Sequence, residues 1–162
     1  MTAVSPGRSA LRAIWTGGLL AGAFDIAFAI VFYGYARGST AARVLQSVAS
    51  GWLGKASFDG GAGAAALGLL THFGIATGAA AAFYGASRVL PALVHEPVAG
   101  GVLFGIGLYA FMNLVVIPLS AAPFRPSLAP ASALPGVAAH MFLIGLPIAL
   151  CARRFGPDPE PV

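Results

Sequence analysis

The sequence predicts an all-α membrane protein with four transmembrane helices and an amphipathic interfacial helix between the first and the second. Of its 162 residues, 58% are hydrophobic and only 9% are charged. Soluble domains carry about 25% charged residues, so this chain lacks the polar surface that a globule in water needs. The 22 glycines fit the same class, because small residues let helices pack closely in a bilayer.

Four apolar stretches are long enough to cross a bilayer, whose core of about 30 Å requires about 20 mostly apolar residues per helix. They cover residues 13–35, 63–87, 97–119 and 134–152. Together they form one membrane domain, 13–152, between an N-terminal cytoplasmic segment, 1–12, and a polar C-terminal tail, 153–162. The first stretch exceeds the usual apolar core of a signal peptide and contains Asp25, so we interpret it as a retained span.

The segment between the first two spans has a helical periodicity of its own. Its apolar residues recur at helical spacing, at Ala41, Val44, Leu45, Val48, Ala49, Trp52 and Leu53, with Arg43, Gln46, Ser47 and Ser50 on the other side. The pattern predicts a helix over about 40–53 that lies at the headgroup level, with Trp52, Arg43 and Lys55 as anchors. The alternative is an ordinary extramembrane helix packed on the other helices.

Prolines shape the third connection and the fourth span. The connection "PLSAAPFRPSLAPASALP" has prolines at 118, 123, 126, 130 and 135. This spacing predicts extended backbone that folds back over the mouth of the helix bundle. Pro147 is expected to bend the fourth span or to start a local break, and the tail after it is expected to be disordered.

The basic residues give a weak indication of orientation. With four spans both termini share a side, and that side holds five bases against four on the other. The two sets are Arg8, Arg12, Arg88, Arg153 and Arg154, and Arg37, Arg43, Lys55 and Arg125. Because basic residues favour the cytoplasmic side, we expect both termini in the cytoplasm of a bacterial cell.

Glycines at helical spacing predict where the spans touch one another. The expected contact positions are Gly18 and Gly22 in the first span, Gly74 and Gly78 in the second, and Gly101 and Gly105 in the third. Asp25 shares the face of Gly18 and Gly22, so we expect it to point toward a neighbouring helix rather than toward lipid.

Polar residues inside the spans form the candidate site, because a charged residue in a bilayer is costly and is therefore a default candidate for function. At similar depth the four spans contribute Asp25, His72, Tyr109 with Asn113, and His140. One interpretation is structural, namely hydrogen bonds that fix the register of the helices. Another is a small polar cavity for protons or solutes, and a third is a bound cofactor or metal.

Motifs of known chemistry are missing from the sequence. It contains no GxSxG, HExxH, CxxC or phosphate-binding loop with a following lysine, so no catalytic residue is assigned. The single Cys151 cannot form an intramolecular disulfide, and no His or acidic pair has metal-binding spacing. We therefore predict no cofactor and no metal site. The scattered bases do not suggest nucleic-acid binding.

The stretch from Gly100 to Arg154, "GGVLFGIGLYAFMNLVVIPLSAAPFRPSLAPASALPGVAAHMFLIGLPIALCARR", resembles the last two spans of the YagU-like family of small bacterial inner-membrane proteins. The segment "ARVLQSVASGWLGKASFDGG" is similar to uncharacterised bacterial membrane proteins. The resemblance implies a four-span inner-membrane protein. It implies no activity and no catalytic or binding residues, although His140 matches a recurrent position of that family.

The leading functional hypothesis is a non-enzymatic inner-membrane protein that moves protons or a small solute past its polar site. The alternative is an accessory or structural subunit that packs against a larger membrane complex, and a distant one is a cofactor-binding helical bundle. The expected partners are the lipid bilayer and either further copies of the chain or a larger complex, since four spans enclose little volume.

Overall fold

The computed structural model describes residues 6–126 and 129–155, and every regular element within them is helical. Four helices are long and apolar enough to cross a membrane: Ser9–Arg37, Gly61–Val89, Pro97–Leu119 and Ala133–Phe155. This finding confirms the all-α fold with four candidate spans, as in a multi-pass membrane protein. The first helix already begins at Pro6. The prediction of a disordered tail over 153–162 is wrong for residues 153–155, which end the last helix, and its remainder, 156–162, lies outside the described residues.

The elements follow one another as expected, with two additions. The first two spans are α1 (Pro6–Arg37) and α3 (Gly61–Val89), separated by α2 (Ala41–Leu53) and the 3₁₀ turn η1 (Gly54–Phe58). After the short α4 (Ala92–His95), the third span consists of α5 (Pro97–Phe111), η2 (Met112–Val116) and α6 (Ile117–Leu119). The fourth consists of α7 (Pro130–Ala139), η3 (His140–Gly145) and α8 (Leu146–Phe155). The additions are η2 and η3, which are π-helical.

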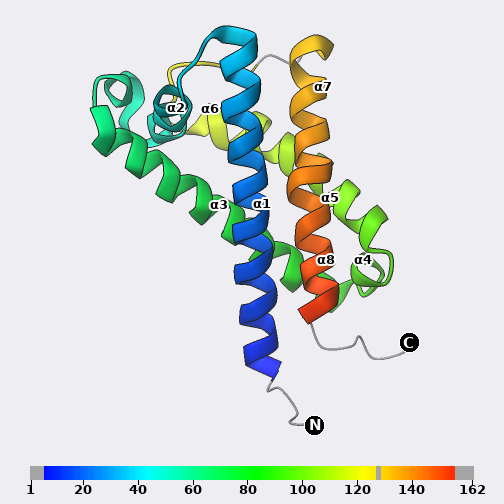
Figure 1. The fold of residues 1–162 in the computed structure, drawn as a ribbon. Helices are drawn as coiled ribbons and strands as arrows, with labels where there is room; N and C mark the ends of the chain where they lie inside the picture. The colour runs from blue at the N-terminus through cyan, green and yellow to red at the C-terminus, as the bar shows by residue number, and fades with distance from the viewer. Residues whose placement is uncertain (1–5, 127–128, 156–162) are drawn as a thin grey trace.

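The spans are not equally close to one another. In Figure 1, α1 and the α7–α8 helix stand side by side, α3 crosses them obliquely, and both termini lie at the same end. α3 packs against α1 and α2, whereas α5 packs against α7, η3 and α8. α3 and α5 touch where the rings of Phe83 and Phe104 meet edge to face, with centroids 5.1 Å apart. They share few other contacts, so the bundle is open between them.

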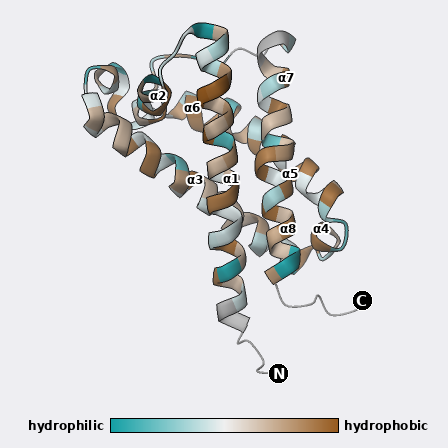
Figure 2. Cartoon of the chain, in the orientation of Figure 1, coloured by the Kyte–Doolittle hydropathy of each residue, from teal (hydrophilic) through white to brown (hydrophobic). Residues whose placement is uncertain are grey.

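The core is small and consists mostly of small side chains. Its buried cluster comprises Ala21, Ala79, Ala80, Phe83, Val94, Ile144, Ile148, Ala149 and Ala152. Many large apolar side chains lie outside it, among them Val31, Leu70 and Leu103. Figure 2 shows hydrophobic residues along the middle of the helices and hydrophilic ones mainly toward their ends and in the connections. This distribution suits a molecule whose middle faces lipid.

The predicted helix between the first two spans is present as α2, but its orientation differs from the prediction. Thr40 caps it, accepting a hydrogen bond from the backbone N–H of Arg43 at 3.2 Å. Gln46 and Ser50, predicted on the polar side, are only 7% and 0% exposed, whereas Trp52 is 68% exposed. Gln46 is buried because its Nε2 donates to the carbonyl of Gly61 at 3.1 Å, which ties α2 to the start of α3.

The two π-helical turns occur at equivalent positions before prolines. η2 ends at Val116, two residues before Pro118, and η3 ends at Gly145, two residues before Pro147. A proline has no N–H to donate and its ring collides with the carbonyl four residues earlier, so the preceding turn widens. The structure thus confirms the local break expected at Pro147.

The prediction of extended backbone from Pro118 to Pro135 is wrong at both ends of the connection, since Pro118 and Leu119 belong to α6 and α7 begins at Pro130. Pro130 is at the start of α7, where its missing N–H costs nothing because the first N–H groups of a helix have no partner within it. Pro135 is inside the same helix. Earlier in the connection the backbone N–H of Ala121 donates to the carbonyl of Gly51 at 3.0 Å. The connection therefore lies against the end of α2.

Candidate functional site

The candidate site begins where α3 crosses α1. A Cβ atom on Gly18 would come within 2.6 Å of the Cα of Thr77, and one on Gly22 within 2.8 Å of the ring of Phe73. Two glycines one turn apart therefore bring the backbones of α1 and α3 together. This close approach carries the side chains of α3 directly to the polar groups of the α1 backbone.

A second close approach joins α5 to the fourth span. A Cβ on Gly101 would lie 2.8 Å from the carbonyl oxygen of Gly145, and one on Gly105 would overlap the carbonyl oxygen of His140. By contrast, a Cβ on Gly74 or Gly78 would meet no atom within 4 Å. In the part of the chain that the structure describes, therefore, no neighbouring helix lies close to these two glycines of α3.

His72 spans the contact between α3 and α1. Its Nε2 lies 2.9 Å from the carbonyl oxygen of Gly22. A carbonyl can only accept a hydrogen bond, so Nε2 is the protonated nitrogen of the neutral ring and Nδ1 carries a lone pair. The bond fixes the imidazole one helical turn from Asp25.

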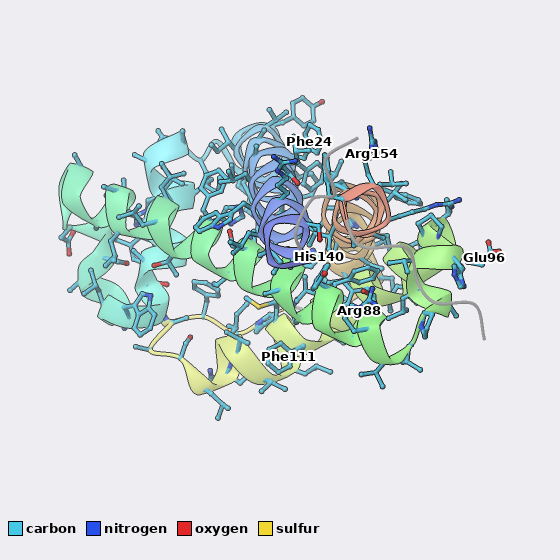
Figure 3. The ribbon with its side chains drawn as sticks, turned by 90° about the horizontal axis from the view of Figure 1, so that it is seen from below. Phe24, Arg88, Glu96, Phe111, His140 and Arg154 are labelled. Atoms are coloured by element: carbon cyan, nitrogen blue, oxygen red, sulfur yellow. The ribbon has the colours of Figure 1, made fainter. Side chains whose placement is uncertain are left out.

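His140 is the first residue of the π turn η3 and bonds its own helix. Its Nδ1 lies 2.9 Å from the carbonyl oxygen of Gly136, so in the neutral ring Nδ1 carries the proton and Nε2 carries the lone pair. The ring of Tyr109 from α5 meets the imidazole edge to face, with centroids 5.3 Å apart. Figure 3 shows His140 between the ribbons of α1, α3 and the fourth span.

Asp25 lies on α1 between two occupied faces. One face carries Gly18 and Gly22 and meets α3, and the other carries Gly17 and Ala21 and meets α8 and η3. Asp25 is seven residues from Gly18 and four from Ala21, so at about 100° per residue it projects between these faces. α1 packs against η3, the turn that begins with His140, and Asp25 and His72 both lie within electrostatic range of the His140 imidazole.

The carboxylate of Asp25 has no direct partner in the described part of the chain: no hydrogen bond or ion pair reaches it from residues 6–126 or 129–155. Among the same residues no side-chain nitrogen or oxygen is both buried and unbonded. The free oxygens of Asp25, and the unbonded ring nitrogens of His72 and His140, are therefore not fully buried, and all three side chains are half-buried.

Asn113 has a different role from the other predicted site residues. Its Nδ2 donates to the carbonyl oxygen of Tyr109, four residues earlier, at 2.8 Å. Asn113 lies in the π turn η2, and His140 lies in the π turn η3. Each of the two side chains forms a hydrogen bond with the backbone carbonyl four residues earlier in its own helix. The structure thus brings together Asp25, His72, His140 and Tyr109, while Asn113 bonds its own helix.

Two features of the site were not foreseen from the sequence. The carbonyl of Gly22 is the partner of His72, and the only available signal was the place of Gly22 in the small-residue stripe of α1. A Cβ on Gly136 would lie 2.7 Å from the ring of Tyr109, so this glycine makes room for the tyrosine beside His140.

The predicted interface anchors lie on or just after α2. The Nε1 of Trp52 donates to Oγ1 of Thr71 on α3 at 3.1 Å. The guanidinium of Arg43 lies 4.3 Å from the ring centroid of Phe58 and donates to the Phe58 carbonyl at 3.3 Å. Lys55 is exposed in η1. These contacts fix α2 along the first half of α3.

Within the described ranges no three His, Cys, Asp or Glu residues are placed so that they could hold a metal ion together. Cys151 is buried against Gly17, nearer the end of the molecule that carries the termini. Comparison of the chain with protein-family models, curated proteins and solved structures finds no match.

Proposed function

We propose that this chain is a bacterial inner-membrane protein that conducts protons or a small solute through the site formed by Asp25, His72 and His140. The observation that carries the proposal is the carboxylate of Asp25, which forms no hydrogen bond or ion pair with the described residues although it lies just past the midpoint of a helix long and apolar enough to cross a membrane. Its open oxygens indicate that water, a proton or a solute offsets its charge.

The energetic argument favours function over a purely structural role. A charged Asp at the bilayer centre costs about 2.5–3.5 kcal/mol on insertion scales. An Asp that served only the register of the helices would recover part of this cost through an interhelical hydrogen bond, and Asp25 forms none with the described residues. The bond that fixes α3 on α1 is made by His72 instead.

The proposed orientation places both termini in the cytoplasm. The two termini lie at the same end (Figure 1), together with Arg88 and the paired Arg153 and Arg154. The bias of bases toward the cytoplasm supports this direction. The polar site then lies in the outer half of the membrane, and α2 with its Trp52 lies at the outer interface.

The proposal is tested by flux into proteoliposomes that contain a trapped pH-sensitive dye. Under an imposed potential or gradient, the wild type is expected to carry protons, which the dye reports, or a small solute, whose entry is measured as swelling of the liposomes. Asp25→Asn keeps the shape of the side chain and removes its charge, so it is expected to abolish the flux without loss of folding. Asp59→Asn is the matched control, because Asp59 is exposed in a connection. Equal flux in wild type and Asp25→Asn would reject the proposal.

A subunit role is the second candidate, and the open face of α3 favours it. Gly74 and Gly78 are uncovered in the single chain, and exposed small residues on a membrane helix allow another helix to approach closely. Native mass spectrometry of the protein released gently from its own membranes distinguishes the two functions. A stoichiometric second polypeptide would support the subunit role, whereas further copies of the same chain fit a homo-oligomeric conductor.

A further inference from the structure

The unbonded atoms of the site are all hydrogen-bond acceptors. The carbonyl of Gly22 holds the proton of His72 on Nε2, and the carbonyl of Gly136 holds that of His140 on Nδ1. The remaining nitrogens therefore offer lone pairs, and the carboxylate of Asp25 offers only acceptors as well. The ring of Tyr109 meets the imidazole of His140 edge to face, and a tyrosine hydroxyl is able to donate or to accept.

Along the helices that carry these acceptors, no Lys or Arg lies near Asp25, His72, Tyr109 or His140 in the sequence. α1 contributes Asp25, α3 contributes His72, α5 contributes Tyr109 and η3 contributes His140. The nine Lys and Arg residues of the chain lie near the ends of the spans or between them. An anion would meet the carboxylate without a compensating cation, at high electrostatic cost in a low dielectric. A proton or another cation therefore suits the site better than an anion.

Among cations, the proton fits this donor set best. Alkali and alkaline-earth ions prefer shells of several oxygens, and the site offers a single carboxylate beside two imidazoles. Softer metal ions need three or more protein ligands within reach of one point, and the described residues form no such group.

We infer that the species carried is the proton and that His140 relays it between Asp25 and the rest of the path. This inference rests on the proposed conducting function and names its substrate. In the relay step the O–H bond of protonated Asp25 breaks while an N–H bond forms at Nε2 of His140, directly or through a water molecule. The products are a carboxylate and an imidazolium, and no oxidant or reductant is involved.

The hydrogen bond from Nδ1 to the Gly136 carbonyl persists throughout this step, because the imidazolium still carries its Nδ1 proton. His140 can therefore gain and lose a proton at Nε2 without disturbing the π turn that it begins. The structural and the relay roles of the ring thus reside on different nitrogen atoms.

The chain itself provides a variant that separates these roles. Asn113, in the other π turn, donates from its amide to the carbonyl four residues earlier at 2.8 Å. His140→Asn is expected to make the same bond to Gly136 but has no titratable nitrogen. Asn113→Ala is the matched control, because it removes the equivalent bond and leaves every relay atom in place.

The experiment measures proton, sodium, potassium and chloride fluxes in proteoliposomes. The wild type is expected to carry protons only, His140→Asn to lose at least ten-fold in proton flux while keeping its thermal midpoint, and Asn113→Ala to keep its flux. The inference would be overturned if His140→Asn kept its proton flux, or if the wild type carried another ion or a neutral solute. Either result would leave the proposed conducting function standing. A wild type that carries nothing would overturn both.

A measurement without a variant covers the case in which His140→Asn does not fold. Proton transfer between oxygen and nitrogen atoms slows in D₂O, so the wild-type flux is expected to fall there beyond the change caused by solvent viscosity. An identical viscosity-corrected flux in H₂O and D₂O would contradict the relay.

Discussion

His72 on α3 bonds the backbone carbonyl of Gly22 on α1, with its Nε2 atom 2.9 Å from the carbonyl oxygen. The two residues lie at the crossing between the first two spans, where the ring of Phe73 also packs against Gly22. One turn further along α1 lies Asp25, which has no such partner in the described chain. The histidine thus holds the helices together, and the carboxylate beside it stays accessible.

Replacing His72 with alanine should weaken the contact between α1 and α3. Interhelical hydrogen bonds in membranes contribute about 0.6 kcal/mol on average, so we expect a loss of about that size in the free energy of unfolding. The measurement is a denaturant titration in mixed micelles. His95→Ala is the control, because His95 is exposed in α4. A stability as high as that of the wild type would show that the bond contributes nothing.

Adding one methyl group at Gly105 should destabilise the contact between α5 and η3. Its Cβ would overlap the carbonyl oxygen of His140, and backbone on both sides limits relief. Overpacking of this kind costs about 1–3 kcal/mol, so Gly105→Ala is expected to lower the thermal midpoint in detergent. At Gly107 a Cβ meets no atom within 4 Å, so Gly107→Ala should be neutral or slightly stabilising. Equal losses in both variants would contradict this packing.

The depth of Trp52 tests the interfacial position of α2. Trp15→Phe leaves Trp52 as the only tryptophan, because the chain has two. Its fluorescence should be quenched more by lipids brominated near the headgroup than by lipids brominated near the chain end, since aromatic anchors lie at the interface. Absence of quenching by any brominated lipid would place α2 in water.

The orientation of the chain is accessible to cysteine labelling. Cys151→Ala removes the only cysteine, which is buried in α8, and Lys55→Cys or Arg88→Cys then adds one at either end of the molecule. A membrane-impermeant maleimide applied to intact spheroplasts is expected to label position 55 and to spare position 88. The reverse pattern would invert the proposed topology, and labelling of both positions would contradict the count of membrane crossings.

The sequence was sufficient to predict the four spans because apolar length is a local property of the chain. The third span matches the predicted range, 97–119, and the other three begin or end within a few residues of theirs. The π turns were foreseen only in part: an irregularity at Pro147 was expected, but the equivalent one before Pro118, inside the predicted third span, was not.

The partners within the site depended on long-range geometry. The candidate residues were chosen from the sequence by residue type and by depth in the membrane. The hydrogen bond between His72 and the Gly22 carbonyl depends instead on where α3 crosses α1, which the sequence does not reveal. The polar side of α2 was misplaced for a similar reason: Gln46 turns inward to reach the carbonyl of Gly61, which periodicity does not reveal. Helical spacing identifies faces, whereas the crossing of helices decides what each face meets.

The measurement that tests the central claim most directly is modification of Asp25 by a hydrophobic carbodiimide in intact proteoliposomes. Such reagents react with protonated carboxyl groups inside membranes. The modified residue is found by peptide mass spectrometry, and the proton flux is followed in parallel. A proton-exchanging Asp25 predicts an adduct at this residue and a flux that falls in proportion to its occupancy. Adducts confined to carboxyl groups outside the spans, such as Asp59 and Glu96, with Asp25 unmodified, would contradict the account.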